Sequence, residues 1–189
     1  MNKEEIRNII KQQKSELTKE YIESESNKII EKLLIHPAFL NSKFIFTYVS
    51  FNQEVRTGKL IKQGMKDKKQ IAVPKIINNR LEFIWIDNQS SYETSTIGIN
   101  EPIEEKVVSK AELESMSEIL MIVPGLAFDK NKNRIGYGKG YYDAYFLENE
   151  SIPFTKIGIT YDFQIIENII PSYNDVKIDE IISQSYHIV

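Results

Sequence analysis

The residues of this chain that most clearly suggest chemistry lie in one short run, residues 134–143 (RIGYGKGYYD). Its three glycines allow positive φ angles and let the backbone approach a ligand closely. Arg134 and Lys139 place two cations beside them. The run leads into a predicted helix, and the free N–H groups at the start of a helix favour phosphate. We therefore predict a phosphate-binding site that includes Gly136, Gly138 and Gly140.

The same run carries aromatic and acidic side chains. Tyr137, Tyr141 and Tyr142 offer aromatic faces on which a flat ring can stack. Asp143 places a hard oxygen ligand about one turn into the predicted helix, where Mg²⁺ would bridge it to phosphate oxygens. These residue types favour a site for a phosphate group with its magnesium ion, next to a planar ring.

The glycine pattern matches neither of the two common phosphate-binding motifs. A Walker A loop ends in Gly-Lys followed by Ser or Thr, whereas Lys139 is followed by Gly140. A dinucleotide fingerprint needs G-x-G-x-x-G, and the spacing here is G-x-G-x-G. The residues alone therefore leave a second interpretation open, in which the run is a flexible strand-to-helix loop with a tyrosine-rich packing patch.

The longer run over residues 124–143 (PGLAFDKNKNRIGYGKGYYD) resembles the signature of the 5-formyltetrahydrofolate cyclo-ligase family, also called methenyltetrahydrofolate synthetases. The family pattern is Pro-Gly-small-x-Phe-Asp, then Arg-Leu-Gly-x-Gly-x-Gly-Tyr-Tyr-Asp, and Ile135 replaces the usual Leu. The resemblance covers nearly the whole chain. It implies an enzyme that uses ATP and Mg²⁺ to convert 5-formyltetrahydrofolate to 5,10-methenyltetrahydrofolate, with phosphorylation of the formyl oxygen and release of ADP and phosphate.

The family also opens with a Lys-x-x-x-Arg pair that contacts ATP, and Lys3 and Arg7 occupy those positions here. Their i, i+4 spacing places both on one helical face, although spacing alone would favour an ordinary solvated face. The resemblance implies that ATP contacts Lys3, Glu4, Glu5, Ile6, Arg7, Arg134, Ile135, Gly136, Tyr137, Gly138, Lys139, Gly140, Tyr141 and Tyr142. Arg134 and Lys139 are the expected catalytic cations.

A second matching segment is residues 49–57 (VSFNQEVRT), in which the family has a folate-binding glutamate. Glu54 stands at that position, and a carboxylate can accept paired hydrogen bonds from a pterin. Without the resemblance, Glu54 would be interpreted as an exposed loop acid. The expected folate contacts are Val49, Phe51, Glu54, Tyr137, Gly138, Lys139, Gly140 and Tyr141.

A third segment, residues 171–180 (PSYNDVKIDE), resembles a family region with two acids four residues apart. The resemblance implies that Asp175 holds Mg²⁺ together with Asp143, and that Asp179 is structural. Asn174 stands where the family commonly has His. Asp129 is expected to form a turn by accepting hydrogen bonds from its own backbone.

Alternating helices and strands must position these residues. Periodic apolar residues predict helices from the start to about residue 17 and at residues 18–35, 57–68, 109–117 and 140–149. Short apolar runs predict strands at residues 43–50, 70–74, 81–86, 118–123 and 155–160, with a final strand or strand pair near 180–189. Residues 87–105 and 124–140 are predicted loops. We therefore expect a three-layer α/β/α fold, one domain over residues 1–189, with a mostly parallel central sheet that binds ligands at its carboxyl ends.

Composition narrows the function classes. A net charge of -3 disfavours a nucleic-acid partner, and the absence of cysteine excludes thiolate chemistry. The two histidines, His36 and His187, are too far apart in sequence to suggest a histidine-based metal site. The charged start and the short apolar runs predict a cytoplasmic protein without a membrane segment. We expect a monomer whose partners are small-molecule substrates.

Two rival functions stay open at this level. One is a sugar-phosphate isomerase-like or acyl-transfer enzyme on a related fold, which would leave the triple-glycine segment unexplained. The other is a non-catalytic folate-binding paralogue, which should lack one of the expected cations or acids.

Overall fold

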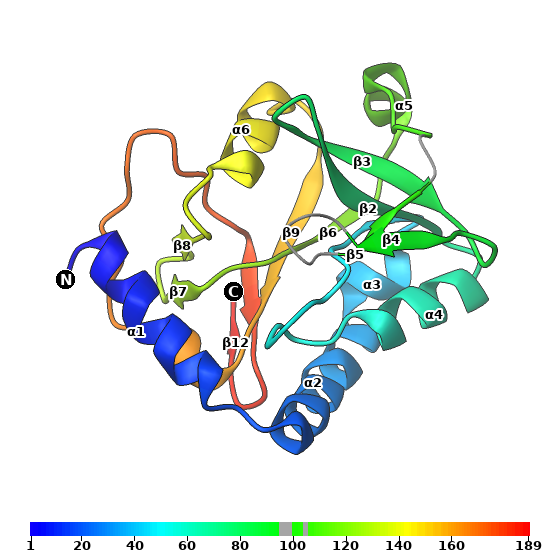
Figure 1. Cartoon of the computed structure of the whole chain (residues 1–189). Helices are drawn as coiled ribbons and strands as arrows, with labels where there is room; N and C mark the ends of the chain where they lie inside the picture. Colours follow the sequence, from blue (N-terminus) through cyan, green and yellow to red (C-terminus); the bar gives the residue numbers. More distant parts are fainter. Residues whose placement is uncertain (95–99, 104–105) are drawn as a thin grey trace.

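A seven-stranded sheet forms the centre of the computed structural model, which describes residues 1–94, 100–103 and 106–189 (Figure 1). Its strands are β1 (Phe44–Phe46), β2 (Gln70–Ile77), β3 (Arg80–Ile86), β6 (Ile119–Val123), β9 (Phe154–Ile159), β11 (Glu180–Ile182) and β12 (His187–Ile188). They lie in the order β12-β11-β9-β6-β1-β2-β3. All pairs are parallel except the two at the edges, β11 with β12 and β2 with β3. The predicted mostly parallel sheet is confirmed.

Helices cover both faces of this sheet. On one face, α2 (Lys19–Leu34), α3 (Pro37–Asn41) and α4 (Gly58–Lys66) bury residues such as Leu33 and Leu60 against Ile45 and Ile122. On the other face lie α5 (Lys110–Ser115) and α6 (Tyr141–Glu148), in an aromatic cluster with the sheet. Strand β6 lies between these layers and is buried along its whole length, as expected of a central parallel strand. The predicted three-layer architecture is therefore confirmed.

The first helix, α1 (Lys3–Ser15), packs against a small second sheet rather than the central one (Figure 1). This sheet contains β7 (Ala127–Asp129), β8 (Arg134–Ile135) and β10 (Ile165–Ile166), and η1 (Asp162–Gln164) leads into it. Ile6 and Ile10, one turn apart, are buried with Ala127 and Ile135. This contact brings the amino-terminal helix beside the glycine-rich run.

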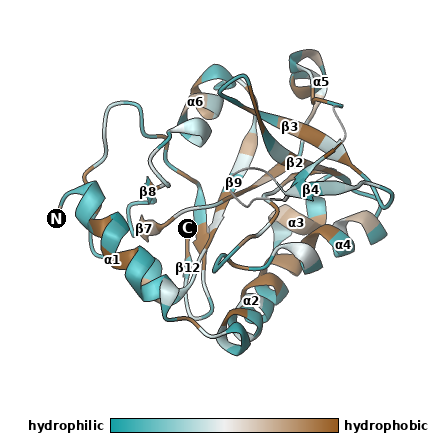
Figure 2. Cartoon of the chain, in the orientation of Figure 1, coloured by the Kyte–Doolittle hydropathy of each residue, from teal (hydrophilic) through white to brown (hydrophobic). Residues whose placement is uncertain are grey.

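In α1, α2 and α4, hydrophobic residues alternate with hydrophilic ones so that each helix has an apolar side (Figure 2). Thr18 caps α2 as predicted, because its hydroxyl accepts a hydrogen bond from the backbone N–H of Tyr21 (3.1 Å). Among the described residues, no helix combines the length and the apolar character that crossing a membrane requires.

Several predicted element boundaries were wrong. The strand expected at residues 43–50 ends at Phe46, because the backbone then turns and the Tyr48 carbonyl accepts a hydrogen bond from the Thr57 hydroxyl (2.7 Å). The strand expected to end at Pro74 continues to Ile77, because a turn with positive φ at Asn78 and Asn79 returns it as a hairpin with β3.

Two predicted loops contain strands. The glycine-rich loop includes the β7–β8 hairpin, which the turn at Asp129 closes. The loop expected at residues 87–105 includes a pair of short strands, β4 (Tyr92–Thr94) and β5 (Asn100–Pro102). Residues 95–99 and 104–105 of that prediction lie outside the described residues.

Candidate active site

A cavity of about 310 Å³ opens at the carboxyl ends of the central strands. The predicted residues that line it come from the loop after β1 and from the glycine-rich run: Val49, Phe51, Glu54, Arg134, Gly136, Tyr137, Lys139, Gly140, Tyr141, Tyr142 and Asp143. Two segments separated by about eighty residues in sequence thus face one space. This edge of a parallel sheet is where ligands commonly bind.

Glu54 is buried at the wall of this cavity, with only 8% of its surface exposed. One carboxylate oxygen accepts a hydrogen bond from the Tyr137 hydroxyl (2.8 Å), and the other accepts one from the Phe51 backbone N–H (3.2 Å). Burial raises the pKa of Glu54, and the bonds from Phe51 and Tyr137 offset this only in part. Burial also raises the pKa of Tyr137, so its hydroxyl remains a donor to Glu54.

Two cations that the sequence did not single out act on Glu54. Lys14, in the last turn of α1, is only 6% exposed, and Arg56 follows Glu54 closely in sequence. Burial lowers the pKa of Lys14, while the charge of Glu54 raises it in part. The charges of Lys14 and Arg56 in turn pull the pKa of Glu54 downward. A signal was present in the sequence, because Lys14 continues the i, i+4 series of Ile6 and Ile10 on the buried face of the helix.

The glycine-rich run forms a tight turn immediately before α6. Gly138 has φ 109° and Gly140 has φ 69°, which are values that residues with a side chain rarely adopt. Gly140 is the N-cap residue of α6, so the free N–H groups of the first helical turn follow the turn directly. Lys139 lies between the two glycines, is exposed, and lines the cavity. This arrangement suits an anion held by N–H groups and an ammonium.

Arg134 is held rigidly behind this turn. Its guanidinium donates to Asp143 (2.9 Å) and to the Pro124 carbonyl (3.3 Å), and its side chain is only 4% exposed. The guanidinium also lies 5.7 Å from the centre of the Tyr142 ring. Among the described residues, Arg134 Nε and the Tyr142 hydroxyl are buried without a hydrogen-bond partner.

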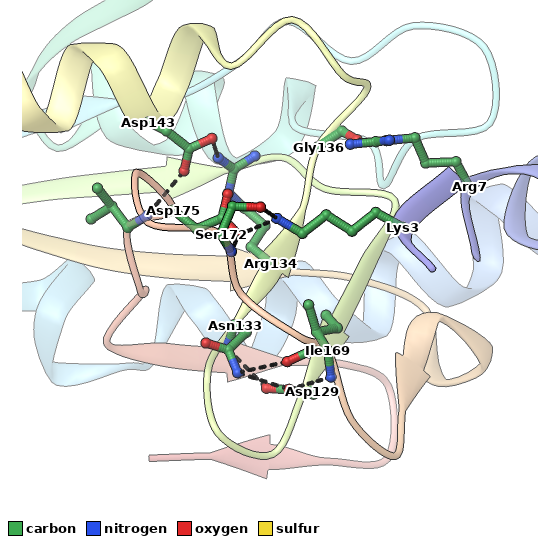
Figure 3. A network of polar contacts seen from close by, with 11 residues as sticks. Lys3, Arg7, Asp129, Asn133, Arg134, Gly136, Asp143, Ile169, Ser172 and Asp175 are labelled. Atoms are coloured by element: carbon green, nitrogen blue, oxygen red, sulfur yellow. Dashed lines mark hydrogen bonds and ion pairs between the residues drawn. The ribbon is translucent and has the colours of Figure 1, made fainter. Parts of the chain in front are cut away.

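The amino-terminal helix completes the site from the other side (Figure 3). Arg7 Nε donates to the Gly136 carbonyl (3.0 Å). Lys3 forms an ion pair with Asp175 and donates to the Ser172 hydroxyl (2.7 Å). Burial would raise the pKa of Asp175, but the bonds from Lys3 and Ser172 outweigh it and lower that pKa. Arg7 therefore reaches the glycine-rich run, and Lys3 reaches the segment expected to hold Mg²⁺, although neither residue lines the cavity.

The other predicted ATP contacts on α1 have structural roles in the fold. Ile6 is buried in the apolar contact with the small sheet. The Asn2 side chain accepts from the backbone N–H groups of Glu4 and Glu5, and the Glu5 carboxylate accepts from the Asn2 N–H (2.8 Å). A role in ATP binding for Glu4, Glu5 and Ile6 stays a prediction.

Asp143 and Asp175 lie on two segments that are joined by a hydrogen bond. The backbone N–H of Val176, the residue after Asp175, donates to Asp143 (3.1 Å). Both carboxylates supply the oxygen ligands that Mg²⁺ prefers, and each retains acceptor capacity beyond the bonds described. The residues therefore fit a magnesium ion, which would compete with Arg134 and Lys3 for the two carboxylates.

The remaining predicted acids are structural. Asp129 accepts from the backbone N–H of Asn131 (2.9 Å), which confirms the predicted turn. Asp179 accepts from the Lys156 N–H (2.7 Å) and ties β9 to the start of β11.

Part of the cavity wall was missed. The additional lining residues are Tyr48, Pro74, Lys75, Ile76, Leu81, Glu101 and Pro124. Most belong to the β2–β3 hairpin and to β5, where Lys75 donates to the Pro102 carbonyl (2.8 Å). Lys75 and Ile76 were missed because the predicted strand stopped at Pro74.

Comparison with known proteins identifies the family. The model of the 5-formyltetrahydrofolate cyclo-ligase family matches residues 1–184. A probable 5-formyltetrahydrofolate cyclo-ligase of Caenorhabditis elegans is 29% identical over 99% of this chain and 95% of its own length. The 5-formyltetrahydrofolate cyclo-ligase of Mus musculus is 30% identical over 94% of this chain and 91% of its own length.

Solved structures agree. The 5,10-methenyltetrahydrofolate synthetase of Aquifex aeolicus superposes with a TM-score of 0.82 at 28% identity, over 99% of this chain and 92% of that one. The corresponding protein of Mycoplasma pneumoniae gives a TM-score of 0.72 at 27% identity, over 97% and 99%. The resemblance seen in the glycine-rich run thus extends to the whole fold, and the chain belongs to the 5-formyltetrahydrofolate cyclo-ligase family.

Proposed function

We propose that this protein uses ATP and Mg²⁺ to convert 5-formyltetrahydrofolate to 5,10-methenyltetrahydrofolate, with release of ADP and phosphate. The observation that carries the proposal is the shared cavity, in which buried Glu54 and its partner Tyr137 face the same space as the glycine turn and Lys139. The reaction needs one group that binds the ring of the folate and another that binds the phosphates of ATP. Glu54 and the glycine turn offer these two features in one cavity.

The folate is the substrate assigned to the Glu54 end of the cavity. The ionised carboxylate would accept hydrogen bonds from the pterin, while Val49, Phe51 and the rings of Tyr137 and Tyr141 flank it. The charges of Lys14 and Arg56 lower the pKa of Glu54 and so help this buried carboxylate to stay ionised. The formyl group would then point toward the glycine turn.

The ATP phosphates are assigned to the turn before α6. Lys139 and the helix N–H groups would hold the transferred phosphoryl group, with Arg134, Arg7 and Lys3 neutralising charge around it. Asp143 and Asp175 would hold Mg²⁺, which supplies charge neutralisation to the phosphate oxygens. The protein's main contribution is positioning, since phosphoryl transfer needs little covalent help.

The proposed reaction has two stages, phosphorylation of the formyl oxygen and then ring closure by N10 of the folate. The formyl oxygen attacks the γ-phosphorus, and the bond to ADP breaks. The formyl carbon, now bonded to a good leaving group, is attacked by N10 of the folate. N10 loses its proton, and phosphate leaves with the former formyl oxygen. Lys139 and Arg134 would stabilise the negative charge that passes through these steps.

The direct test is to incubate the protein with ATP, Mg²⁺ and 5-formyltetrahydrofolate and to follow the near-ultraviolet absorbance of the methenyl product. We expect an absorbance rise that needs ATP and is matched by one ADP per product. Binding of the folate without turnover would instead identify a non-catalytic folate-binding protein. Absence of both binding and turnover would reject the proposal.

We further propose a cytoplasmic location and a monomeric state, although a relative from Arabidopsis thaliana is named mitochondrial. We also propose that residues 1–189 act as one domain, of which the family model matches residues 1–184. Fractionation and light scattering test the first two.

A further inference from the structure

Both histidines of the chain meet around one carboxylate, far from each other in sequence. His36 Nε2 lies 3.1 Å from a Glu180 oxygen, and His187 Nε2 lies 2.6 Å from the same oxygen. The two imidazole rings are 5.1 Å apart and nearly perpendicular. The separation of the two histidines in sequence did not suggest a shared site. Sheet pairing and the α2–α3 corner bring the three residues together.

The fold explains why these side chains converge. Glu180 begins β11, and His187 in β12 pairs with Ile182, so Glu180 and His187 are diagonal neighbours on one face of the sheet. His36 precedes α3 and reaches the same face from the covering helices. Two strands and the N-cap position of a helix therefore hold the three side chains.

The separations suit coordination of one small cation. All three ligand atoms lie within 4.8 Å of one another. In a tetrahedral zinc site with bonds of about 2.0–2.1 Å, neighbouring ligand atoms are about 3.3 Å apart. Two imidazoles and one carboxylate are a common zinc donor set, with water as the fourth ligand. The His187 side chain is 41% exposed, so both the ion and that water can reach the site.

This cluster is separate from the cavity. Glu180 lies at the amino end of a strand that runs parallel to β9 and, through it, to β6. The cavity lies beyond the carboxyl end of β6, where Pro124 lines it. Glu180 is level with Ile157 of β9 and thus with Ile122 of β6, so the two sites are separated across the sheet rather than along its strands. None of the three residues lines the cavity, and the acids proposed for Mg²⁺ do not belong to this cluster.

We propose that His36, Glu180 and His187 form a binding site for one divalent transition-metal ion, with Zn²⁺ as the best match. The ion replaces the protons that now link the two imidazoles to Glu180. It fastens the carboxyl-terminal hairpin of β11 and β12 to the start of α3.

Binding has a defined cost at His36. In the metal-free protein, its Nδ1 accepts a hydrogen bond from the Ala38 backbone N–H (3.2 Å), so the proton of the neutral ring is on Nε2. Coordination through Nε2 moves that proton to Nδ1 and breaks the bond to Ala38. The lost bond is a long helix cap, which metal coordination can outweigh.

The test measures Zn²⁺ uptake by the full chain in excess Mg²⁺, which occupies hard-oxygen sites. We expect one Zn²⁺ per chain, and at least about a tenfold loss of affinity in both His187→Asn and Glu180→Gln. The matched control is Glu118→Gln, which removes another exposed carboxylate from an ion pair with Lys43 and should leave affinity unchanged. No uptake, or equal uptake by His187→Asn, overturns the proposal.

Nuclear magnetic resonance adds a readout that does not depend on stability. With only two histidines, His187→Asn assigns both sets of imidazole signals. We expect Zn²⁺ to shift both rings and to move the His36 proton to Nδ1. A shift confined to His187 would show an adventitious surface ion and would reject the three-residue site.

Discussion

Two acidic residues of the glycine-rich segment, Asp129 and Asp143, differ in how fully their oxygens are hydrogen-bonded (Figure 3). Asp129 is fully buried, and its oxygens accept hydrogen bonds from the N–H groups of Asn131, Asn133 and Ile169 and from the Asn133 side chain. The Asp143 side chain is 20% exposed at the cavity, and within the described part of the chain it accepts hydrogen bonds from Arg134 and Val176 alone.

The difference lies in the acceptor capacity that each carboxylate has left. A carboxylate offers about four acceptor sites, and those of Asp129 are filled by donors fixed in the fold. Asp129 can therefore only hold structure, closing the β7–β8 turn and joining it to Ile169. Asp143 retains capacity that faces the cavity, so a cation can still bind. Partner number and exposure, rather than residue type, separate structural acids from candidate ligands.

The largest expected effect is on the free energy of unfolding when Asp129, whose acceptor sites are all filled, is replaced. Asp129→Ala would leave several buried N–H donors without an acceptor, and we expect it to lower the free energy of unfolding by about 3–5 kcal/mol. Urea denaturation measures this. Asp87→Ala is the matched control, since Asp87 accepts from Gln89 in an exposed turn and should cost about 1 kcal/mol or less. Equal losses would remove the distinction between the two kinds of acid.

A large effect on catalysis without an effect on stability is expected at the glycine turn. Lys139→Ala should lower kcat/KM by about 100- to 1000-fold, because a positioned charge at the phosphate is lost. The unfolding midpoint should not change, since Lys139 is exposed. Lys130→Ala, at an exposed lysine in the neighbouring turn, should have no effect on rate. An unchanged rate in Lys139→Ala would place the phosphate elsewhere.

Glu54→Gln should weaken folate binding about 10- to 100-fold, since a buried charge-assisted acceptor is lost. Burial raises the pKa of Glu54, so wild-type affinity should fall with decreasing pH earlier than an ordinary glutamate would predict. Stability should change in the opposite direction. The folded state binds the proton more tightly than the unfolded state, so wild-type stability relative to the variant rises as pH falls through the raised pKa. Titration calorimetry and denaturation across acidic pH test both signs.

The smallest effect should come from Lys14→Met. It removes one of the two cations that lower the pKa of Glu54, so the acid limb of folate binding should shift to higher pH. It also removes a buried ammonium, and we expect the melting temperature to rise by about 2–4 °C. Lys11→Met, on the exposed face of the same helix, is the control and should change neither property. A shift in the control equal to that in Lys14→Met would mean that the effect is not local.

Much of the fold was predictable because its signals are local. The buried strand β6 is a continuous apolar run, and Thr18 marks the start of α2. The strand end at Phe46 and the extension of β2 did not follow from the apolar pattern, because hydrogen bonds to other segments decide them. Thr57 holds the backbone after β1, and pairing with β3 extends β2.

The candidate site also has a part that could be predicted from the sequence and a part that could not. The run at residues 134–143 was identified as a candidate site from its glycine spacing and its charges. Its resemblance to the cyclo-ligase signature also indicated the family. The burial of Glu54 beside Lys14 could not be inferred locally, because those residues come from different elements. The meeting of His36 with His187 likewise depends on how β12 returns beside β11.

The sequence by itself determined which groups are available: a glycine turn with two cations, a flanking aspartate and a mostly parallel α/β framework. Composition, periodicity and motif spacing can be recognised in the sequence without knowledge of the fold. The tertiary structure decided which acids are saturated and which remain open, because hydrogen-bond partners and burial arise from packing between distant segments. Asp129 and Asp143 look alike in sequence and differ only in what the folded chain places around them.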